Sequence, residues 1–586
     1  MHPAGRVFLT LGRAHIDVSF SCGCTSTSFA PPSFSFLPRA GCRGGIMTDS
    51  IAVQKARSTF GSDVSAQEIV SCSGNAFVTH VRLEGGRVNK VWSTGRMVRN
   101  MNVLLRGELD GQGRPRFVNQ PHCLCNDGHA LAAIRAVEDL AGVVLPHSAV
   151  LVRRIVQSLR CIQEHLLHFY QFHLSDWASL AAALAADAVE TARLSTMPDE
   201  DADHFRMVRE RLASLAKAHP APMPEAAYRG AGELHLLLYG HALRAIRAGA
   251  SLQTALGLLG CGPKGFSAYR LGGLSSDLDL DVPVIGRLRA ALAECRDFVS
   301  SVFPGDVAHI ARVYGPWAEK GRGHAFLTWD GAGPGSLIVP GADEASWRVL
   351  PSEGGAVREE SEPDWCNEDR SCYRLSSDWN RPSFRWERDD FFWLSAPRHG
   401  RDACEVGPLA RVLGGWLHGR DEVRQTMTAV LDDGGLSLEA MNSTMGRVLS
   451  RAIECAAGMR SVFGWLEELE GVWQAEDRHD ADFVLPASGT GVGRVEVPRG
   501  SLAHTVCWDH GRIVNHEYLI PSLWNFSPRD SRGAPGPLES ALAGAFVADP
   551  DSPVEILRTL HQLDPCNTCH VMVEDRDTGR TSLITA

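Results

Sequence analysis

Two cysteines, Cys566 and Cys569, lie close to the end of this chain, in the sequence DPCNTC. A C-x-x-C pair in a chain that is not rich in cysteine indicates a metal or redox site more than a disulfide. A tetrahedral metal site needs four ligands, so this pair supplies half of one. The best candidates for the other half are Cys123 and Cys125, far upstream. Because thiolates select soft or borderline metals, the sequence predicts one metal site that joins the two ends of the chain.

The overall composition limits the class of protein and of partner. Sixteen cysteines in 586 residues are too sparse for a disulfide scaffold, and a hydrophobic fraction of 44% is ordinary for a globular chain with a large core. The net charge of −11 argues against a nucleic-acid partner. No apolar run is long enough to span a bilayer and the N-terminus lacks a signal pattern, so we expect membrane attachment only through a partner.

The spacing of apolar residues predicts a mainly α-helical fold with small β-sheets (α+β). Helices are expected where apolar positions recur every three or four residues, at 129–145, 151–169, 177–194, 230–258, 283–302, 405–418, 435–471, 539–543 and 554–560. Alternation predicts a hairpin at residues 76–95 and strands at 503–508 and 512–520. Residues 320–395 are rich in Gly, Pro and Trp and predict irregular structure.

The chain divides into three segments. Residues 1–65 are rich in Ser, Phe, Pro and Gly without periodicity, which is typical of a poorly ordered extension. Our hypothesis is that translation begins at Met47; an intact mass that includes Met1 contradicts it. Residues 66–572 are expected to form one large domain, and residues 573–586 form a C-terminal tail.

From about Ala76 to the C-terminus the chain resembles the large subunit of nickel–iron hydrogenases, and seven segments carry the resemblance. They are residues 123–139 (CLCNDGHALAAIRAVED), 164–177 (EHLLHFYQFHLSDW), 393–398 (WLSAPR), 405–411 (EVGPLAR), 498–500 (PRG), 524–530 (WNFSPRD) and 554–569 (VEILRTLHQLDPCNTC). Together these segments are highly specific, whereas the C-x-x-C alone is not. The resemblance implies a long central helix bundle with both cysteine pairs at its centre.

The resemblance also implies that the cysteines hold a nickel–iron centre whose iron carries carbon monoxide and cyanide. Cys125 and Cys569 match the pair that bridges both metals, and Cys123 and Cys566 match the pair that binds nickel only. The first pair departs from the family, because its spacing is C-x-C instead of C-x-x-C. Depending on the alignment, the altered ligand is Cys123 or His122. The alternative is that Cys123 is a spare core thiol, which is common for free cysteine.

Three charged residues match family positions around the metals. Arg499, in the PRG segment, matches an arginine over the open side of the centre, and Asp564 matches a carboxylate that holds it. Glu164 matches a second acid. An arginine between two carboxylates is held by charge-assisted hydrogen bonds, so we expect these three residues to take part in the chemistry. The alternative for any arginine is a surface ion pair, which is its commoner role.

Other positions depart from the family close to the chemistry. Gly74 stands where the resemblance implies a proton-transferring glutamate, and Pro121 replaces an arginine. Asn102 and Met572 replace a glutamate and a histidine that bind magnesium, and neither is a hard anionic ligand suited to that ion. Residues 264–267 (KGFS) lack the histidine of the family loop. This pattern favours a divergent member whose activity is altered or lost.

Three interpretations of function remain open from the sequence. The first is the large subunit of an enzyme that oxidises or produces H2, in a heterodimer with an iron–sulfur small subunit. The resemblance then implies a maturation protease, nickel and iron insertion proteins, synthesis in the cytoplasm, and a membrane or periplasmic location through the small subunit. The second is a non-catalytic paralogue that carries the iron fragment during assembly or acts as a sensor. The third is a zinc-bound structural protein; metal analysis separates the three.

The tail after Met572 matches a maturation signal that the family loses once nickel has arrived. The expected scissile bond is Met572–Val573, and the composition of the tail is compatible with a strand. Such a strand is expected to hold the C-terminal segment open until the metal is loaded. The enzyme interpretation therefore predicts that the tail is removed, and the scaffold interpretation predicts that it is retained.

Overall fold

The structure is a computed structural model, which describes residues 6–11, 14–19, 77–95, 105–109, 126–216, 223–261, 268–329, 336–340, 347–350, 397–399, 402–473, 483–527, 529, 534–566 and 569–585. Its α-helices are α4 (Asn126–Ala141), α5 (His147–Leu166), α6 (Leu180–Ala185), α7 (Ala188–Leu194), α8 (Ala202–Ala216), α9 (Gly232–Leu258), α10 (Val282–Asp297), α11 (Phe303–Val313), α12 (Pro408–Leu417), α13 (Asp421–Gly434), α14 (Thr444–Val472), α15 (Pro521–Asn525), α16 (Pro537–Leu542) and α17 (Val554–Gln562). Its strands are β1 (Arg6–Leu11), β2 (Ala14–Ser19), β3 (Phe77–Glu84), β4 (Arg87–Gly95), β5 (Tyr269–Arg270), β6 (Gly273–Leu274), β7 (Phe326–Thr328), β8 (Ser336–Pro340), β9 (Trp347–Leu350), β10 (Ser488–Val497), β11 (Gly500–Asp509), β12 (Arg512–Leu519), β13 (Cys569–Asp575) and β14 (Arg580–Thr585). The predicted fold class, mainly α-helical with small sheets, is confirmed.

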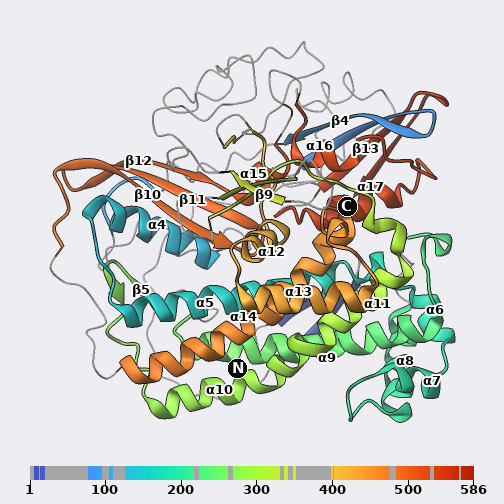
Figure 1. The fold of residues 1–586 in the computed structure, drawn as a ribbon, viewed down its shortest axis with the longest axis horizontal. Coiled ribbons are helices and arrows are strands. Elements are labelled where there is room, and N and C mark those ends of the chain that lie inside the picture. Colours follow the sequence, from blue (N-terminus) through green and yellow to red (C-terminus); the bar gives the residue numbers. More distant parts are fainter. Residues whose placement is uncertain are drawn as a thin grey trace, which may run out of the picture.

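Long helices form the body of the molecule. The helices α5, α9, α10 and α14 run side by side across the lower half of Figure 1. The helix α14 is the central one, because it contacts α5, α10, α11, α12, α13 and α17. It buries two arginines, Arg447 and Arg451, among its apolar residues. Since a charged side chain is rarely buried unless it is paired, these arginines point to a polar cluster inside the core.

Small sheets lie above the bundle. The strands β10, β11 and β12 form an antiparallel sheet that is covered by α4. A four-stranded sheet has the order β14-β13-β3-β4, and in it β13 runs parallel to β3. This sheet joins segments almost 500 residues apart in sequence, so that β4 (blue) and β13 (red) lie together in Figure 1. The remaining described sheets are β1-β2, β5-β6 and β7-β8-β9.

Glycines allow α4 to lie directly on the sheet. A Cβ atom at Gly491 would lie 2.0 Å from the carbonyl oxygen of Ala136, and one at Gly493 would lie 1.9 Å from that of Ala132. Both distances are shorter than any real contact, so only glycine fits at these two positions. The close approach brings the side chains of α4 against those of β11.

The sequence predicted several elements well and merged others. The hairpin β3-β4, the strands β11 and β12, and the helix α9 lie where the patterns place them. The helix expected at residues 177–194 is instead two short helices, α6 and α7, because Ser179 and Asp187 cap new helices through their side chains. The helix expected at 435–471 begins only at Thr444, after the N-cap Ser443.

Other elements differ more from those expected from the sequence. The region expected as one helix at 283–302 is α10 followed by a π-helical turn (Phe298–Val302) that continues into α11. The helices α8 and α13 and the strand β10 are not predicted by the patterns, and β7 to β9 lie in the segment expected to be irregular. The expected extension, residues 1–65, lies outside the described residues apart from β1 and β2.

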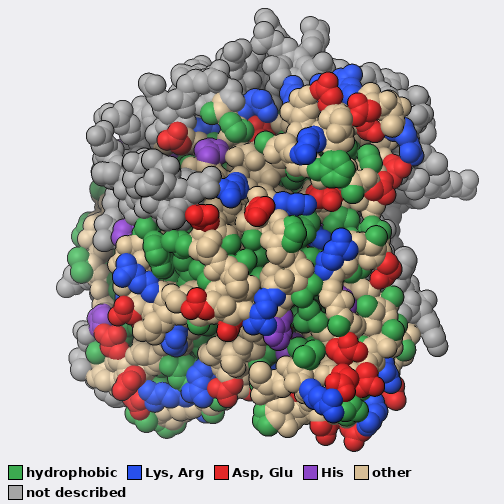
Figure 2. Space-filling view, turned by 45° about the vertical axis from the view of Figure 1, so that its right-hand side comes forward, with side chains coloured by type: hydrophobic (Ala, Val, Ile, Leu, Met, Phe, Trp, Pro, Cys, Tyr) green, Lys and Arg blue, Asp and Glu red, His purple; other side chains and the backbone are tan. Residues whose placement is uncertain are grey.

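The surface carries charges of both signs. On the face shown in Figure 2, Lys and Arg side chains are interspersed with Asp and Glu rather than gathered into a patch of one sign. Within the described part of the chain, no helix combines the length and the apolar character that a membrane crossing requires.

Candidate metal centre

The C-terminal cysteines lie at the junction of a helix and a sheet. The chain leaves α17 through Asp564, whose backbone is left-handed at φ 51°. This conformation is rare outside glycine, although aspartate tolerates it better than most residues. Cys566 follows, and its backbone N–H donates a 3.1 Å hydrogen bond to the hydroxyl of Ser522. Cys569 is then the first residue of β13, and it is fully buried.

Sheet pairing fixes the position of Cys569. Its strand β13 lies between β3 and β14, and Cys569 is opposite Phe77 in the parallel register with β3. The apolar side chains of Val571 and Val573, on the same strand, are buried in the main core. The tail beyond Met572 is extended, as expected: its first residues continue β13, and the rest forms β14 in the same sheet as Cys569.

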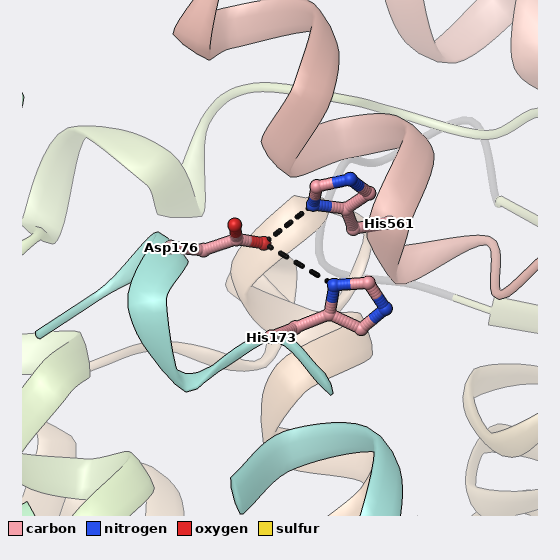
Figure 3. A group of neighbouring side chains, drawn as sticks. All are labelled: His173, Asp176 and His561. Carbon is pink, nitrogen blue, oxygen red and sulfur yellow. Dashed lines mark hydrogen bonds and ion pairs between the residues drawn. The ribbon is translucent and has the colours of Figure 1, made fainter. Parts of the chain in front are cut away.

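Polar contacts anchor the end of α17, which is followed directly by the segment with Asp564 and Cys566. Figure 3 shows Asp176 next to the rings of His173 and His561. The Nδ1 atom of His561 lies 2.8 Å from Oδ2 of Asp176, and His168 Nε2 donates a 2.9 Å hydrogen bond to the carbonyl of His561. Arg558 Nε donates to the carbonyl of Asp176 at 2.7 Å. These three contacts between α17 and the turn after α5 hold this helix end in place.

The ligand atoms of His173, Asp176 and His561 lie within 4.8 Å of one another, which is close enough to hold a metal ion. The two rings are stacked, with centroids 4.3 Å apart and planes 28° apart, and His561 already binds Asp176 directly at 2.8 Å. Burial alone would raise the pKa of Asp176, but His561 outweighs it and lowers that pKa, so the carboxylate stays ionised. We interpret the group as a hydrogen-bonded anchor.

The structure brings together the three charged residues that the sequence singled out. Arg499 Nη1 donates a 2.9 Å hydrogen bond to Glu164 on α5, and Arg499 Nε lies 3.2 Å from Asp564. On the other side of Asp564, Arg451 lies 3.9 Å away. Burial raises the pKa of Glu164 although Arg499 acts in the opposite direction. Burial also disfavours the charged form of Arg451 and therefore lowers its pKa, to about 10.

The backbone around Arg499 is held by a second arginine, Arg411 of α12. Its guanidinium donates 2.9 Å hydrogen bonds to the carbonyls of Val497 and Pro498, the two residues before Arg499. Glu454 and Glu496 bind the same guanidinium at 2.5 and 2.9 Å, so its charge is compensated. The turn that carries Arg499 is therefore fixed through its own carbonyls.

Close backbone packing completes the support of this turn. Gly407, just before α12, and Gly500, just after Arg499, have φ values of 126° and 133°. A Cβ atom at Gly500 would lie 2.4 Å from a methyl carbon of Val406, and one at Gly407 would lie 3.0 Å from the carbonyl oxygen of Arg499. Glycine is thus favoured at both positions by conformation, and at Gly500 it is also required by space.

A small cavity opens beside Arg499. It has a volume of about 10 Å³ and is lined by Arg451, Arg499, Gln562 and Asp564, together with residues of the α12 N-terminus. This is room for about one water molecule. The charged groups therefore face a nearly dry space, in which electrostatic interactions are stronger than in water.

The chemistry of the two described cysteines fits a bound metal. Burial, together with the neighbouring Cys566, raises the pKa of Cys569 well above the usual range of a thiol. A bound cation would compensate the charge of the thiolates and stabilise the deprotonated form that binds metals. Soft thiolate ligands suit nickel and iron. Cys123 and Cys125 lie outside the described residues, as do Gly74, Asn102, Pro121 and residues 264–267, so this structure does not place them.

The sequence patterns did not single out the residues that support the site. Arg411 lies within the EVGPLAR segment and its partner Glu454 within α14, yet neither role follows from sequence spacing. Arg447 of α14 forms a bidentate pair, at 2.7 and 2.6 Å, with Glu405, the first residue of the EVGPLAR segment. A signal was available: charged residues in otherwise apolar helices are rarely buried without a partner.

The comparisons with known proteins agree with this arrangement. The nickel-dependent hydrogenase family matches residues 99–572, which is most of the chain. The chain therefore belongs to the nickel-dependent hydrogenase family, and the resemblance predicted from the sequence is confirmed. It is a hydrogenase large-subunit-like protein, and a nickel–iron centre is the cofactor that this family implies.

Relatives and solved structures align with more than four fifths of this chain. The Hydrogenase-2 large chain of Escherichia coli (strain K12) is 27% identical, over 84% of this chain and 94% of that protein. The uptake hydrogenase large subunit of Azotobacter chroococcum mcd 1 is 29% identical, over 88% and 97%. The Ni-Fe-Se hydrogenase from Desulfovibrio vulgaris Hildenborough has the same fold, with a TM-score of 0.64, 22% identity, and coverage of 84% and 99%.

Proposed function

We propose that this chain is the metal-binding large subunit of a nickel–iron hydrogenase that catalyses reversible oxidation of H2. The observation that carries the proposal is the buried guanidinium of Arg499. It is held between Glu164 and Asp564, and Asp564 lies two residues before Cys566. A hydrogen-splitting site needs a metal, a base nearby and a dry environment. The cysteine pair, the two carboxylates and the small cavity supply the protein's share of these.

Each side chain has a distinct role in this proposal. Cys566 and Cys569, with Cys123 and Cys125, would hold the nickel–iron centre, which when bound supplies the Lewis acidity and redox chemistry for splitting H2. Arg499 keeps a fixed positive charge in the cavity because carboxylates hold it on two sides. Glu164 is suited to hold a proton, because burial raises its pKa above the usual value of a glutamate.

The proposed partner is an iron–sulfur small subunit. The relatives are named as large chains or large subunits, which supports a heterodimer. The sequence also lacks a clustered four-cysteine motif for an iron–sulfur cluster, so electrons must leave through another chain. We further propose that a maturation protease and metal-insertion proteins act on this chain and that any membrane or periplasmic location comes through the small subunit.

Purification of the chain from its native host tests the proposal. We expect a complex with a smaller iron–sulfur protein, nickel and iron in equal amounts, and H2-dependent reduction of a redox dye. A chain that contains zinc alone, or a stable monomer without H2-dependent activity, contradicts the proposal.

A second candidate is an assembly scaffold that carries iron without nickel. The observation that favours it is the pairing of the tail, because β14 can complete the four-stranded sheet beside Cys569 in a chain that keeps it. In this case we expect the complete tail, iron without nickel, and no dye reduction.

A further inference from the structure

Every N–H group of the buried Arg411 guanidinium has an acceptor. Its Nη1 atom donates to the carbonyl of Val497 and to Glu496, and its Nη2 atom donates to the carbonyl of Pro498, each at 2.9 Å. Glu454 accepts from Nε at 2.5 Å and from Nη2 at 2.9 Å. Because a guanidinium carries five N–H groups, this pattern leaves none of them over and fixes the orientation of the arginine.

A buried histidine supports Arg411 from behind. The Nε2 atom of His165, on α5, lies 2.7 Å from Oε2 of Glu454, on α14. Burial alone would raise the pKa of Glu454, but Arg411 and His165 outweigh it and lower that pKa, so the carboxylate is ionised. Since an ionised carboxylate only accepts hydrogen bonds, His165 donates through Nε2. His165 thus holds the carboxylate that holds Arg411.

These contacts close a ring through the turn that carries Arg499. Pro498 and Arg499 form the two-residue turn between β10 and β11. The guanidinium of Arg499 reaches Glu164, which directly precedes His165 on α5. The side chains of the ring are joined by contacts of 2.9 Å or less or by the chain itself; they belong to Glu164, Arg499, Arg411, Glu454 and His165.

We infer that His165 and Glu454 are positioning residues for Arg499. They hold Arg411 in place, and Arg411 holds the turn that aims the Arg499 guanidinium. The inference rests on the proposed hydrogenase function, in which Arg499 acts beside the metals. Apolar packing does not account for the ring, because α12 and α14 also contact through apolar residues of the main core, and burying charged groups costs free energy even when they are paired. A displacement of about 1 Å can lower a rate about 100-fold, so a fixed turn favours the reaction.

The variant Glu454→Gln breaks the ring at a defined point. One carboxylate oxygen becomes an NH2 group, which cannot accept a hydrogen bond from Arg411 or His165. At least one contact of the ring is therefore lost, and Arg411 keeps only Glu496 as a charged partner. We expect the turn to move and the Arg499 guanidinium to lose its contact with Glu164.

The pKa of Glu164 reports this movement in the metal-free chain, without any enzymatic activity. Burial, Asp564 and Asp127 raise that pKa, whereas Arg499 lowers it. We therefore expect Glu454→Gln to raise the pKa of Glu164, measured by ¹³C NMR on the full chain labelled with ¹³C-glutamate. Loss of the Glu454 charge alone would act in the opposite direction, because a nearby anion raises the pKa of a carboxyl group. An unchanged or lower pKa of Glu164 overturns the inference.

The matched control is Glu138→Gln. Glu138 accepts from Arg153 at 2.8 and 2.7 Å in another buried pair, and Arg153 lies about three helical turns before Glu164 on α5. This variant breaks a pair of the same kind away from the ring, so we expect the pKa of Glu164 to stay unchanged. The same rise in Glu138→Gln would show that loosened packing is the cause, and would overturn the inference.

A second pair of variants serves if Glu454→Gln does not fold. In His165→Gln the side-chain amide can donate from the position of Nε2, whereas His165→Met removes the donor and keeps an apolar side chain of similar length. We expect the pKa of Glu164 to rise in the Met variant and to stay close to the wild-type value in the Gln variant. Equal values in the two variants count against a positioning role.

Turnover of the heterodimer separates the positioning role from the proposed function. We expect Glu454→Gln to lower the kcat of H2-dependent dye reduction at least about tenfold, with nickel and iron contents and the KM for H2 unchanged. Wild-type kcat in the variant refutes the positioning role alone. If the pKa of Glu164 rises as expected but the wild-type complex does not turn over H2, the ring positions Arg499 and the proposed function is wrong.

Discussion

Arg499 donates a 2.9 Å hydrogen bond to Glu164, which lies 335 residues earlier in the chain. The contact joins the turn between β10 and β11 to the end of α5, and Asp564 closes it from the end of α17. Replacing a buried ion pair with apolar residues is often neutral or stabilising, so stability alone does not explain such a group. The arrangement instead fixes the direction of one guanidinium against Asp564, two residues before Cys566.

The first prediction concerns the shape of that guanidinium. Arg499→Lys keeps the charge but loses the planar group that reaches Glu164 and Asp564 together. We expect H2-dependent activity to fall at least about tenfold with unchanged metal content. The control is Arg193→Lys, since Arg193 on α7 is 69% exposed. Loss of metal in Arg499→Lys would show that the arginine is structural instead.

The second prediction concerns the cysteines. Cys569→Ala removes a proposed ligand of both metals, so we expect nickel to be lost and iron to be reduced in metal analysis. Cys455→Ala is the matched control, because Cys455 is a buried thiol of α14 and lies outside the proposed ligand set. Equal nickel contents in the Cys569 variant and the wild type would contradict the proposed ligand set. Cys125→Ala and Cys123→Ala, measured in the same way, decide which upstream thiol is a ligand.

The third prediction concerns pH and a polar cluster away from the metal site. His241 lies between Glu200 and Asp306, at 3.0 and 2.8 Å, with Arg244 and the hydroxyl of Tyr170 bound to the same carboxylates. Burial alone would lower the pKa of His241, but these carboxylates outweigh it and raise that pKa to about 9. Protonated His241 therefore stabilises the fold.

Because the folded-state pKa of His241 exceeds the unfolded value of 6.5, its contribution is fully present below pH 6.5 and is lost as pH rises through 9. We expect the free energy of unfolding, measured with urea, to fall by about 3 kcal/mol over this range. In His241→Gln this part of the pH dependence should disappear. The same slope in the variant would show that another group titrates.

The sequence predicted the helix bundle because long amphipathic helices such as α5 and α9 carry a strong periodic signal. It merged α6 with α7 because the caps Ser179 and Asp187 act through single hydrogen bonds that periodicity does not reveal. It overlooked β10, whose alternating Gly489, Gly491 and Gly493 lack side chains toward α4. The contact of Arg499 with Glu164 followed only from the family resemblance, since no local pattern relates residues so far apart.

The last prediction concerns the tail. The bond Met572–Val573 lies inside β13, where Met572 is opposite His80 of β3 and Leu583 of β14. An ion pair at 3.0 Å joins Glu574 to Arg82, and another at 2.8 Å joins Arg580 to Asp551. A protease needs an extended, accessible segment, so the β13-β14 hairpin must open before this bond can be cut. We therefore expect the folded, metal-free chain to resist cleavage at this bond by added proteases.

C-terminal peptide mass spectrometry, combined with metal analysis of protein from the native host, separates the two functions. The enzyme interpretation predicts a chain that ends at Met572 and contains nickel. Its remaining strand, Cys569 to Met572, would keep its pairing with β3, so Cys569 would stay in place after the cut. The scaffold interpretation predicts an intact Ala586 with iron and no nickel, because no nickel signal would trigger the cut. An intact tail in nickel-loaded protein contradicts both, and would mean that the sheet closed by β14 is compatible with a complete metal site.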